Sequence, residues 1–232
     1  MAAVMRQIPL PLGPDPALDF DGFLPGANEA AVAQLRDAPW SAAPVVYLWG
    51  PAGAGKSHLL SAAAHRMQAE GGRVVWAGAA RPAPWDWPED SDRPALAVID
   101  DCDALDPAQQ QAAFALFVRA AGARQPILAA GSRPPVDLLL RDDLRSRLGW
   151  GLVFQIEPLQ DEEVRAVLVH EAGRRGIPLG EDVARYLQTR FSRDLASLMR
   201  LLDRLDRYAL ARQRGVTVPL LKAMLAEDEP IA

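Results

Sequence analysis

Residues 45–61, VVYLWGPAGAGKSHLLS, decide the fold of this chain. The apolar run at 45–49 predicts a buried strand, and a helical pattern follows Ser57. Between them stands G-x-x-x-x-G-K-[ST] in the setting that a phosphate-binding loop requires, with a strand before it and a helix after it. Glycines let the backbone wrap closely around phosphates, and N–H groups at the helix start point at the anion. We therefore predict that the nucleotide-binding residues are Gly50, Pro51, Ala52, Gly53, Ala54, Gly55, Lys56, Ser57 and His58.

The lysine of this motif has a specific task. Lys56 and Lys222 are the only lysines among 25 basic residues, so the choice of lysine at position 56 needs a reason. In a P-loop, Lys56 reaches the β- and γ-phosphates and Ser57 ligates Mg²⁺. The alternative is a Gly/Ala-rich turn with an accidental lysine, which the flanking strand and helix disfavour.

A second signature follows at residues 95–101, ALAVIDD. Its uninterrupted apolar run predicts a strand buried on both faces, as in a parallel sheet. Asp100 is the predicted magnesium acid, and Asp101 stands where a hydrolytic carboxylate orients the attacking water. The alternative for Asp101 is a surface acid at a strand end. Asp103 and Asp106 are assigned to the next turn, and Asp106 is predicted to cap a helix that starts at Pro107.

Strands and helices alternate over most of the chain, which predicts an α/β fold with a mostly parallel sheet. The expected strands are 45–49, 74–77, 95–101, 152–156 and one within 126–135 that leaves Ser132 at its polar tip; the expected helices are 56–70 and 107–121. After Pro158 the pattern is helical only, with helices beginning at Asp161 and spanning 181–191, 192–214 and 219–226. We expect an extended tail (1–19), an α/β nucleotide-binding domain (20–158) and an all-α lid (159–232).

Composition narrows the class of protein. The chain has 232 residues, a net charge of −5 and one cysteine, Cys102. Internal disulfides are excluded, and the three histidines show no metal-ligand spacing. No run reaches the roughly 18 apolar residues of a membrane span. We expect a reduced, cytoplasmic protein without a membrane partner, whose acidic balance disfavours direct DNA binding but allows a partner that itself sits on DNA.

A P-loop core followed by a helical lid resembles the AAA+ ATPases. FDGFLPGANEAAVAQL (20–35), ALAVIDD (95–101) and LRSRLGWGLVFQIEPLQDEEV (144–164) look like the bacterial replication initiator DnaA, over about residues 20–225. The initiator carries a basic helix-turn-helix domain after its lid, whereas this sequence stops at Ala232. Its loop 79–94 is short and acidic, a poor place for an insertion that contacts DNA. A lid-terminated relative of this kind resembles the Hda family of regulatory inactivators of DnaA.

The resemblance implies partners and a nucleotide. Members of the Hda family bind the DNA polymerase sliding clamp through an N-terminal Gln-x-x-Leu-x-Leu/Phe motif, and here the motif would be Gln7, Ile8, Leu10, Pro11 and Leu12. A leader with chance hydrophobic residues, or a tail packed on its own domain, are the alternatives. The family implies bound ADP or ATP with Mg²⁺, DnaA as partner and DNA contacted only through the clamp. A homo-oligomer is compatible with the fold.

Further residues take roles from the AAA+ pattern. Arg147 of SRLGWG is the expected arginine finger, acting in trans, with Arg145 as the alternative. Arg193 in FSRDLASL matches the lid arginine called sensor 2, and Ser132 stands at sensor 1, where the family often has Asp. Phe20, Phe23 and Asn28 are expected near the base, with core packing as the alternative for the two phenylalanines.

One departure from the pattern bears on catalysis. AAA+ proteins generally carry Glu where this chain has Asp101. The shorter carboxylate places water less well, so a weak intrinsic ATPase is expected.

Three functions follow as hypotheses. The first is a regulatory adaptor that stimulates hydrolysis of initiator-bound ATP while held by the sliding clamp. The second is a DnaA-like, nucleotide-dependent DNA-binding or recruitment protein. The third is a free-standing AAA+ ATPase.

Overall fold

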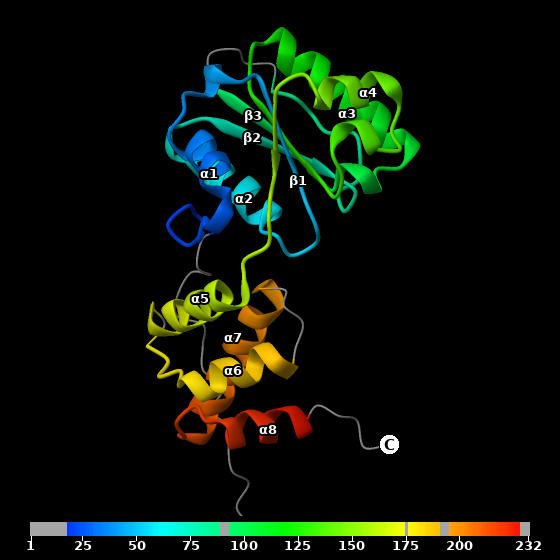
Figure 1. Ribbon diagram of the computed structural model, residues 1–232. Coiled ribbons are helices and arrows are strands. Elements are labelled where there is room, and N and C mark those ends of the chain that lie inside the picture. Colours follow the sequence, from blue (N-terminus) through cyan, green and yellow to red (C-terminus); the bar gives the residue numbers. More distant parts are fainter. Residues whose placement is uncertain (1–17, 89–92, 175, 191–194, 228–232) are drawn as a thin grey trace, which may run out of the picture. The chain divides into compact units, whose positions relative to one another are not determined.

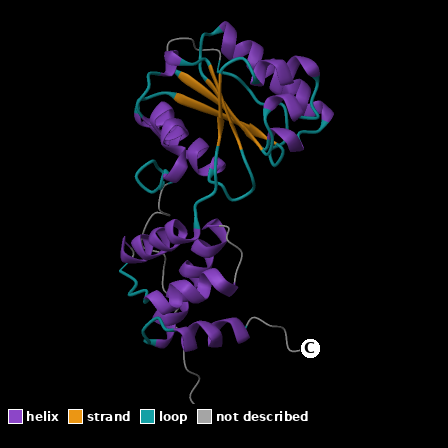
Figure 2. Ribbon diagram, viewed as in Figure 1, coloured by secondary structure: helices purple, strands orange, loops and turns teal. Residues whose placement is uncertain are grey.

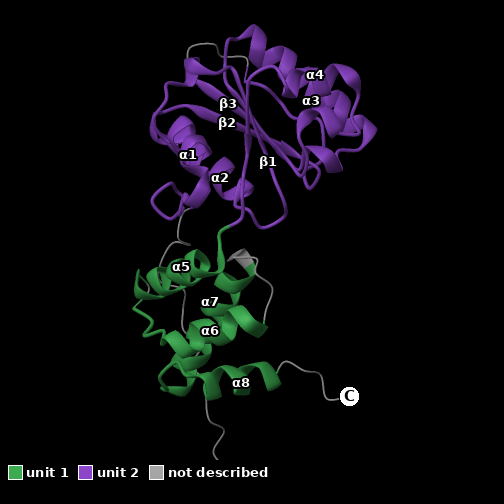
Figure 3. Cartoon of the chain, in the orientation of Figure 1, with its two compact units in different colours: residues 1–16, 159–232 green, residues 17–158 purple. Residues whose placement is uncertain are grey.

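A computed structural model describes residues 18–88, 93–174, 176–190 and 195–227 of the chain. The chain divides into two compact units between Pro158 and Leu159 (Figure 3). The first is an α/β unit and the second is helical, as the colouring by secondary structure shows (Figure 2). Each is described by itself.

The α/β unit is built on a parallel sheet of five strands in the order β2-β3-β4-β1-β5. The predicted α/β fold with a parallel sheet is therefore confirmed. Parallel pairing needs helical crossovers that cover both faces, which is why β1, β3 and β4 are nearly continuous apolar runs. The strands are β1 Val45–Trp49, β2 Arg73–Gly78, β3 Ala95–Asp100, β4 Ile127–Gly131 and β5 Leu152–Gln155.

Helices lie on both faces of this sheet (Figure 1). They are α1 Glu29–Arg36, α2 Lys56–Ala69, α3 Pro107–Gly122 and α4 Asp142–Leu148, with 3₁₀ turns η1 Gly26–Asn28, η2 Trp40–Ala42, η3 Cys102–Ala104 and η4 Pro135–Asp137. Side chains alternate between the two faces of each strand, so Tyr47 joins the core under α3 and α4 while Leu48 joins the core under α1 and α2. The sheet thus separates two apolar cores.

The start of α3 follows the predicted cap. The Asp106 carboxylate accepts a hydrogen bond from the Gln109 backbone N–H at 2.8 Å, and the Gln109 side chain accepts one from the Asp106 N–H at 3.0 Å. Pro107 occupies the first helical turn. This capping box satisfies two helix-end donors and sets where the chain leaves the η3 turn.

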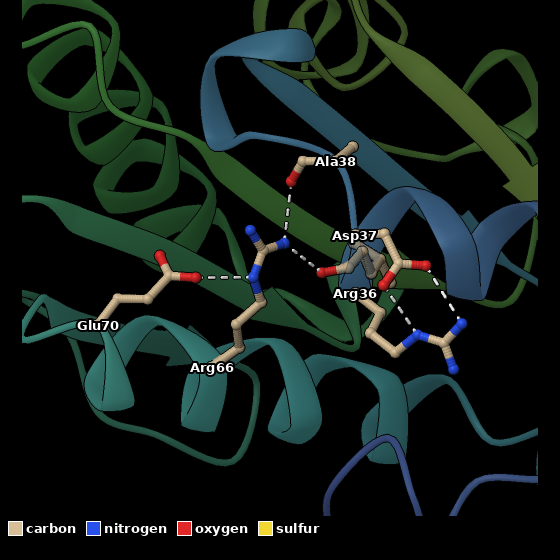
Figure 4. Close-up of polar contacts among 6 residues, drawn as sticks. Arg36, Asp37, Ala38, Arg66 and Glu70 are labelled. Carbon is tan, nitrogen blue, oxygen red and sulfur yellow. Dashed lines mark hydrogen bonds and ion pairs between the residues drawn. The ribbon is translucent and has the colours of Figure 1, made fainter.

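An arginine of α2 fastens the end of α1 (Figure 4). One Nη of Arg66 donates to the carbonyl oxygens of Leu35 at 2.8 Å and Ala38 at 3.0 Å, and its Nε donates to Glu70 at 2.9 Å. The guanidinium also lies over the Trp40 ring, 4.5 Å from its centroid. Carbonyls at a helix end lack intrahelical partners, so this contact holds α1 against α2, the helix that carries the P-loop.

The helical unit contains α5 Asp161–Arg174, α6 Glu181–Arg190, α7 Leu195–Arg212 and α8 Val218–Ala226. Leu198, Leu202, Leu205 and Ala209 recur at helical spacing along α7 and are buried in its core. The Thr217 side chain accepts a hydrogen bond from the Leu220 N–H and caps α8. These bounds agree with the predicted helices to within three residues. No helix in the described ranges is both long and apolar enough to cross a membrane.

Candidate functional site

The loop after β1 approaches its neighbours so closely that glycine is required at two positions. A Cβ on Gly50 would lie 2.2 Å from the carbonyl oxygen of Ile156. Gly55 has φ +96°, and a Cβ there would lie 2.7 Å from Cε2 of Phe23. Only a residue without a side chain fits both the contact and the left-handed conformation. The loop leads directly into α2, whose first residue is Lys56, and the backbone N–H groups at a helix start favour an anion.

Lys56 folds over this loop. Its Nζ donates to the carbonyl oxygens of Gly50 and Pro51, at 2.8 Å each. Burial lowers the pKa of Lys56, although the nearby Asp101 and Asp100 carboxylates act to raise it. A desolvated ammonium group that faces these acids is suited to bind an anionic ligand, because an anion would stabilise its charged form.

Asp100 and Asp101, at the carboxyl end of β3, have different environments. Asp100 is the last residue of the strand, whereas Asp101 lies beyond it in a left-handed conformation, φ +50° and ψ +51°. The Asp101 N–H donates to the Asp100 carboxylate at 3.0 Å. Burial, and then repulsion from Asp100 and Asp103, raises the pKa of Asp101. The predicted strand 95–101 is one residue too long, because a strand cannot continue through a left-handed residue.

Sequence reasoning missed a third acid. Asp103 was assigned to a turn, and it does lie in η3, but its carboxylate accepts hydrogen bonds from the Ser132 N–H at 2.9 Å and the Ser132 hydroxyl at 2.6 Å. Burial opposes ionisation of Asp103, yet the hydrogen bonds from Ser132 outweigh it and lower the pKa. No local pattern marks this pair: β3 and β4 become neighbours only in the folded sheet, where polar residues that follow their carboxyl ends meet at one edge.

The segment before α1 is tied to the P-loop helix. His58 Nε2 lies 2.7 Å from the Asp19 carbonyl oxygen, and its ring meets the Phe23 ring edge-on, with centroids 5.3 Å apart. Phe20 and Phe23 are partly buried against the core under α1 and α2. Core packing, the alternative stated for these two rings, therefore describes their contacts, and His58 contacts the chain itself.

Asn28 is buried, at 4% exposure, and its side-chain amide forms two hydrogen bonds with the backbone. Its Nδ2 donates to the Glu157 carbonyl oxygen at 2.9 Å, and its Oδ1 accepts from the Glu157 N–H at 2.8 Å. The amide thus pairs η1 with the segment after β5. This is a structural link, in which both polar groups of the side chain already have partners.

The two candidate finger residues, in the last turn of α4, differ in their partners. Arg145 forms an ion pair with Asp142 at 2.6 Å. The Arg147 guanidinium carbon lies instead over two aromatic rings, 5.1 Å from the centroids of both Phe114 and Trp150. Within the described residues no carboxylate is paired with Arg147. Its charge is therefore the more available of the two.

Other predicted site residues cannot be placed. Gln7, Ile8, Leu10, Pro11 and Leu12 of the tail, and Arg193 of the lid, lie outside the described residues. An apolar pocket lined in part by Leu35, Trp40, Val46 and Ile127 lies near the amino ends of the strands. Ligands of such sheets bind beyond the carboxyl ends, so this pocket is not the candidate site.

Comparison with known proteins shows what the helical unit and the fold of the chain are similar to. Residues 161–225 match the family of the Hda lid domain. The chain is similar to domain III of the replication initiation protein DnaA from Thermotoga maritima, with 21% identity, a TM-score of 0.73 and coverage of 92% of this chain and 97% of that one. The chain has the AAA+ fold, and its helical unit matches the Hda lid family. The AAA+ core and the small helical lid predicted from sequence are therefore confirmed.

More distant structures share the AAA+ fold. AMPPCP-bound DnaA from Aquifex aeolicus is 20% identical with a TM-score of 0.64, over 83% of this chain and 66% of that chain. The RuvB Holliday junction branch migration motor of Thermotoga maritima is 17% identical with a TM-score of 0.57, over 79% and 61%. This chain therefore spans less than two thirds of the length of these two proteins.

Proposed function

We propose that this protein is a nucleotide-dependent negative regulator of DNA replication initiation, which supplies Arg147 in trans to an initiator's bound ATP. The observation that carries the proposal is the state of Arg147, the finger position of SRLGWG: its guanidinium is held by two rings and paired with no carboxylate in the described chain. An arginine that stabilises charge on a transferred phosphoryl group needs free N–H donors. The Hda-type lid supports the same conclusion.

The protein's own nucleotide, ADP or ATP, fits the loop between β1 and α2. Gly50 and Gly55 tolerate no Cβ where the loop packs against Ile156 and Phe23, α2 starts directly after the loop, and Lys56 donates to oxygen atoms of the same loop. Ser57 and Asp100 would hold Mg²⁺, the usual protein share of such a site, with phosphate oxygens and water completing it.

Asp101 would orient a water molecule in this site. Burial, with repulsion from Asp100 and Asp103, raises the pKa of Asp101, which makes its carboxylate a stronger proton acceptor. Its side chain is one methylene shorter than glutamate and places water less well. The Ser132 hydroxyl is committed to Asp103 rather than to a ligand. The short side chain and the committed hydroxyl favour slow intrinsic turnover, in which the nucleotide mainly sets conformation.

Besides the contact of Arg147 with the initiator's ATP, the proposal includes a contact of the N-terminal tail with the sliding clamp. Gln7, Leu10 and Leu12 provide one amide and two spaced apolar side chains, and the intervening prolines lower the entropy lost when an extended peptide docks. A clamp loaded on DNA would hold the protein at a high local concentration near an initiator, so each single contact can be weak. In this proposal DNA is reached only through the clamp.

The deciding assay follows hydrolysis of initiator-bound ATP with clamp-loaded DNA, comparing the wild type with three single variants. Arg147→Ala should abolish stimulation while its own nucleotide and clamp binding persist. Arg145→Ala, in the same helical turn, is the matched control and should retain stimulation. Gln7→Ala should lose clamp binding and keep nucleotide binding.

Other outcomes would favour the competing functions. Loss of nucleotide binding in Arg147→Ala would place this arginine in its own site and overturn the proposal. Fast turnover by the protein alone would support a free-standing ATPase. DNA affinity with a steep salt dependence would support a recruitment protein.

A further inference from the structure

The aromatic contacts of Arg147 come from two separate elements. Phe114 lies in α3 and Trp150 follows α4, and the guanidinium carbon is 5.1 Å from each ring centroid. Both distances are within the roughly 6 Å over which a cation is attracted to a ring face. The backbone fixes this arrangement, because the Trp150 N–H donates to the Arg147 carbonyl oxygen at 3.2 Å.

Neighbouring arginines are neutralised by ion pairs. Arg141 also lies over Phe114, at 5.8 Å, but its guanidinium is paired with Asp143 at 2.8 Å. Arg145 is paired with Asp142. A carboxylate occupies guanidinium N–H donors, whereas a ring face attracts the charge without accepting an in-plane hydrogen bond. Among the residues that the structure describes, Arg147 is the only one of the three that has no ion pair.

The Trp150 side chain is not buried in the core. This side chain is 73% exposed, which is unusual for so large an apolar group. The next residue, Gly151, passes so close to β1 that a Cβ on it would lie 1.8 Å from the Val45 carbonyl oxygen. The chain is therefore pinned to the sheet immediately after Trp150, and the ring that remains outside contacts Arg147.

We propose that Phe114 and Trp150 are positioning residues, which hold the Arg147 guanidinium against their rings and leave its donors free for phosphate oxygens of a partner's nucleotide. The proposal rests on the proposed function of Arg147. It extends the finger from Arg147 alone to a unit of three residues, with one ring from α3 and the other from the segment after α4. Misplacement of a catalytic group by about 1 Å can lower the rate roughly 100-fold. Loss of a ring that positions Arg147 should therefore be measurable as a lower hydrolysis rate.

The test measures initiator-bound ATP hydrolysis as a function of protein concentration, for full-length chains with clamp-loaded DNA. Trp150→Leu should lower the maximal rate by roughly 10- to 100-fold with little change in the half-saturating concentration. Trp150→Phe, which retains a ring, should restore most of the rate. A rise in the half-saturating concentration alone would instead assign Trp150 to docking and overturn the positioning role.

A second measurement does not depend on the partner. In side-chain NMR spectra, assigned with Arg147→Ala, the Arg147 Hε and Hδ signals should carry ring-current shifts that shrink in Trp150→Leu and Phe114→Leu and persist in Trp150→Phe. Unchanged signals in both leucine variants would overturn the proposal. Shifts that behave as expected in a protein that gives no stimulation would refute the proposed function instead, so the two failures are distinguishable.

Discussion

The acids that face Lys56 show how one carboxylate differs from the next at the scale of a residue. Asp101 and Asp103 stand two positions apart, yet the pKa of the first is raised and that of the second is lowered. The difference comes from partners: like charges surround Asp101, whereas Ser132 donates two hydrogen bonds to Asp103. Hydrogen bonds to the ionised form favour it and neighbouring carboxylates oppose it.

Replacing the P-loop lysine should remove nucleotide affinity. Lys56→Ala deletes the one ammonium group placed over the loop carbonyls, and hydrogen bonds to charged groups are worth about 1.5–3 kcal/mol each. We expect at least a roughly tenfold weaker binding of ADP and ATP, measured by calorimetric titration. Lys222→Ala is the control, because Lys222 is the only other lysine and lies in the lid. Equal losses in both variants would contradict a specific role for Lys56.

Ser132→Ala should raise the pKa of Asp103, because it deletes the hydroxyl donor at 2.6 Å. The carboxylate has a folded pKa below its ordinary 3.8, so its stabilising effect is present above that value and is lost as the pH falls through the folded pKa. The variant should therefore lose less stability than the wild type on acidification below about pH 4. Carboxyl ¹³C titration by NMR would measure the shift; an unchanged pKa would show that the backbone N–H bond alone sets it.

At the scale of elements, two arginines close together in space make unequal contributions. The Arg66 side chain is one-fifth exposed; it contacts the end of α1, the Trp40 ring and Glu70. Arg36 forms its ion pair with Asp37, and the side chains of Arg36 and Asp37 are each at least half exposed. Exposed ion pairs gain little because water competes and the side chains lose freedom. Buried carbonyl oxygens that lose their donor cost more.

Arg66→Ala should lower the free energy of unfolding of the AAA+ domain by about 2–4 kcal/mol, since it leaves the Leu35 and Ala38 carbonyls without this donor. Arg36→Ala should leave that free energy unchanged. Urea denaturation followed by circular dichroism would compare them with the wild type. Similar losses for the two variants would mean that α1 is held by its apolar contacts alone.

At the scale of the whole molecule, each of the two units has a core of its own. Leu128 of β4 is buried in the AAA+ domain, and Leu202 of α7 is buried in the lid. A substitution in one core removes contacts in that unit only. The chain therefore need not unfold as a single two-state system.

Leu202→Ala should destabilise the lid by about 2–5 kcal/mol, and Leu128→Ala should destabilise the AAA+ domain by a similar amount, because each leaves a cavity in a closely packed core. Scanning calorimetry should show that each variant shifts a different transition, and nucleotide should raise the midpoint of the AAA+ transition in the Leu202→Ala protein. A single transition that moves equally in both variants would contradict independent cores.

The sequence by itself determined the strand, loop and helix of the P-loop, the buried β3 strand before Asp100, the cap of α3 and the all-helical lid. Each is a local pattern: an apolar run, a glycine spacing, a capping pair or a helical period places its residue without reference to distant chain. Such signals also carried the AAA+ assignment. They were sufficient because hydrophobic period and end signals act over a few residues.

Only the tertiary structure decided which distant residues meet. The Asp103–Ser132 pair depends on β3 and β4 being neighbours, the Asn28–Glu157 pair on the return of the chain after β5, and the Arg147–Phe114 pair on the packing of α3 against α4. Each of these pairs joins residues far apart in sequence, and no local pattern marks its partner. Strand order and helix packing are set by the burial of both sheet faces at once, which is a property of the whole chain.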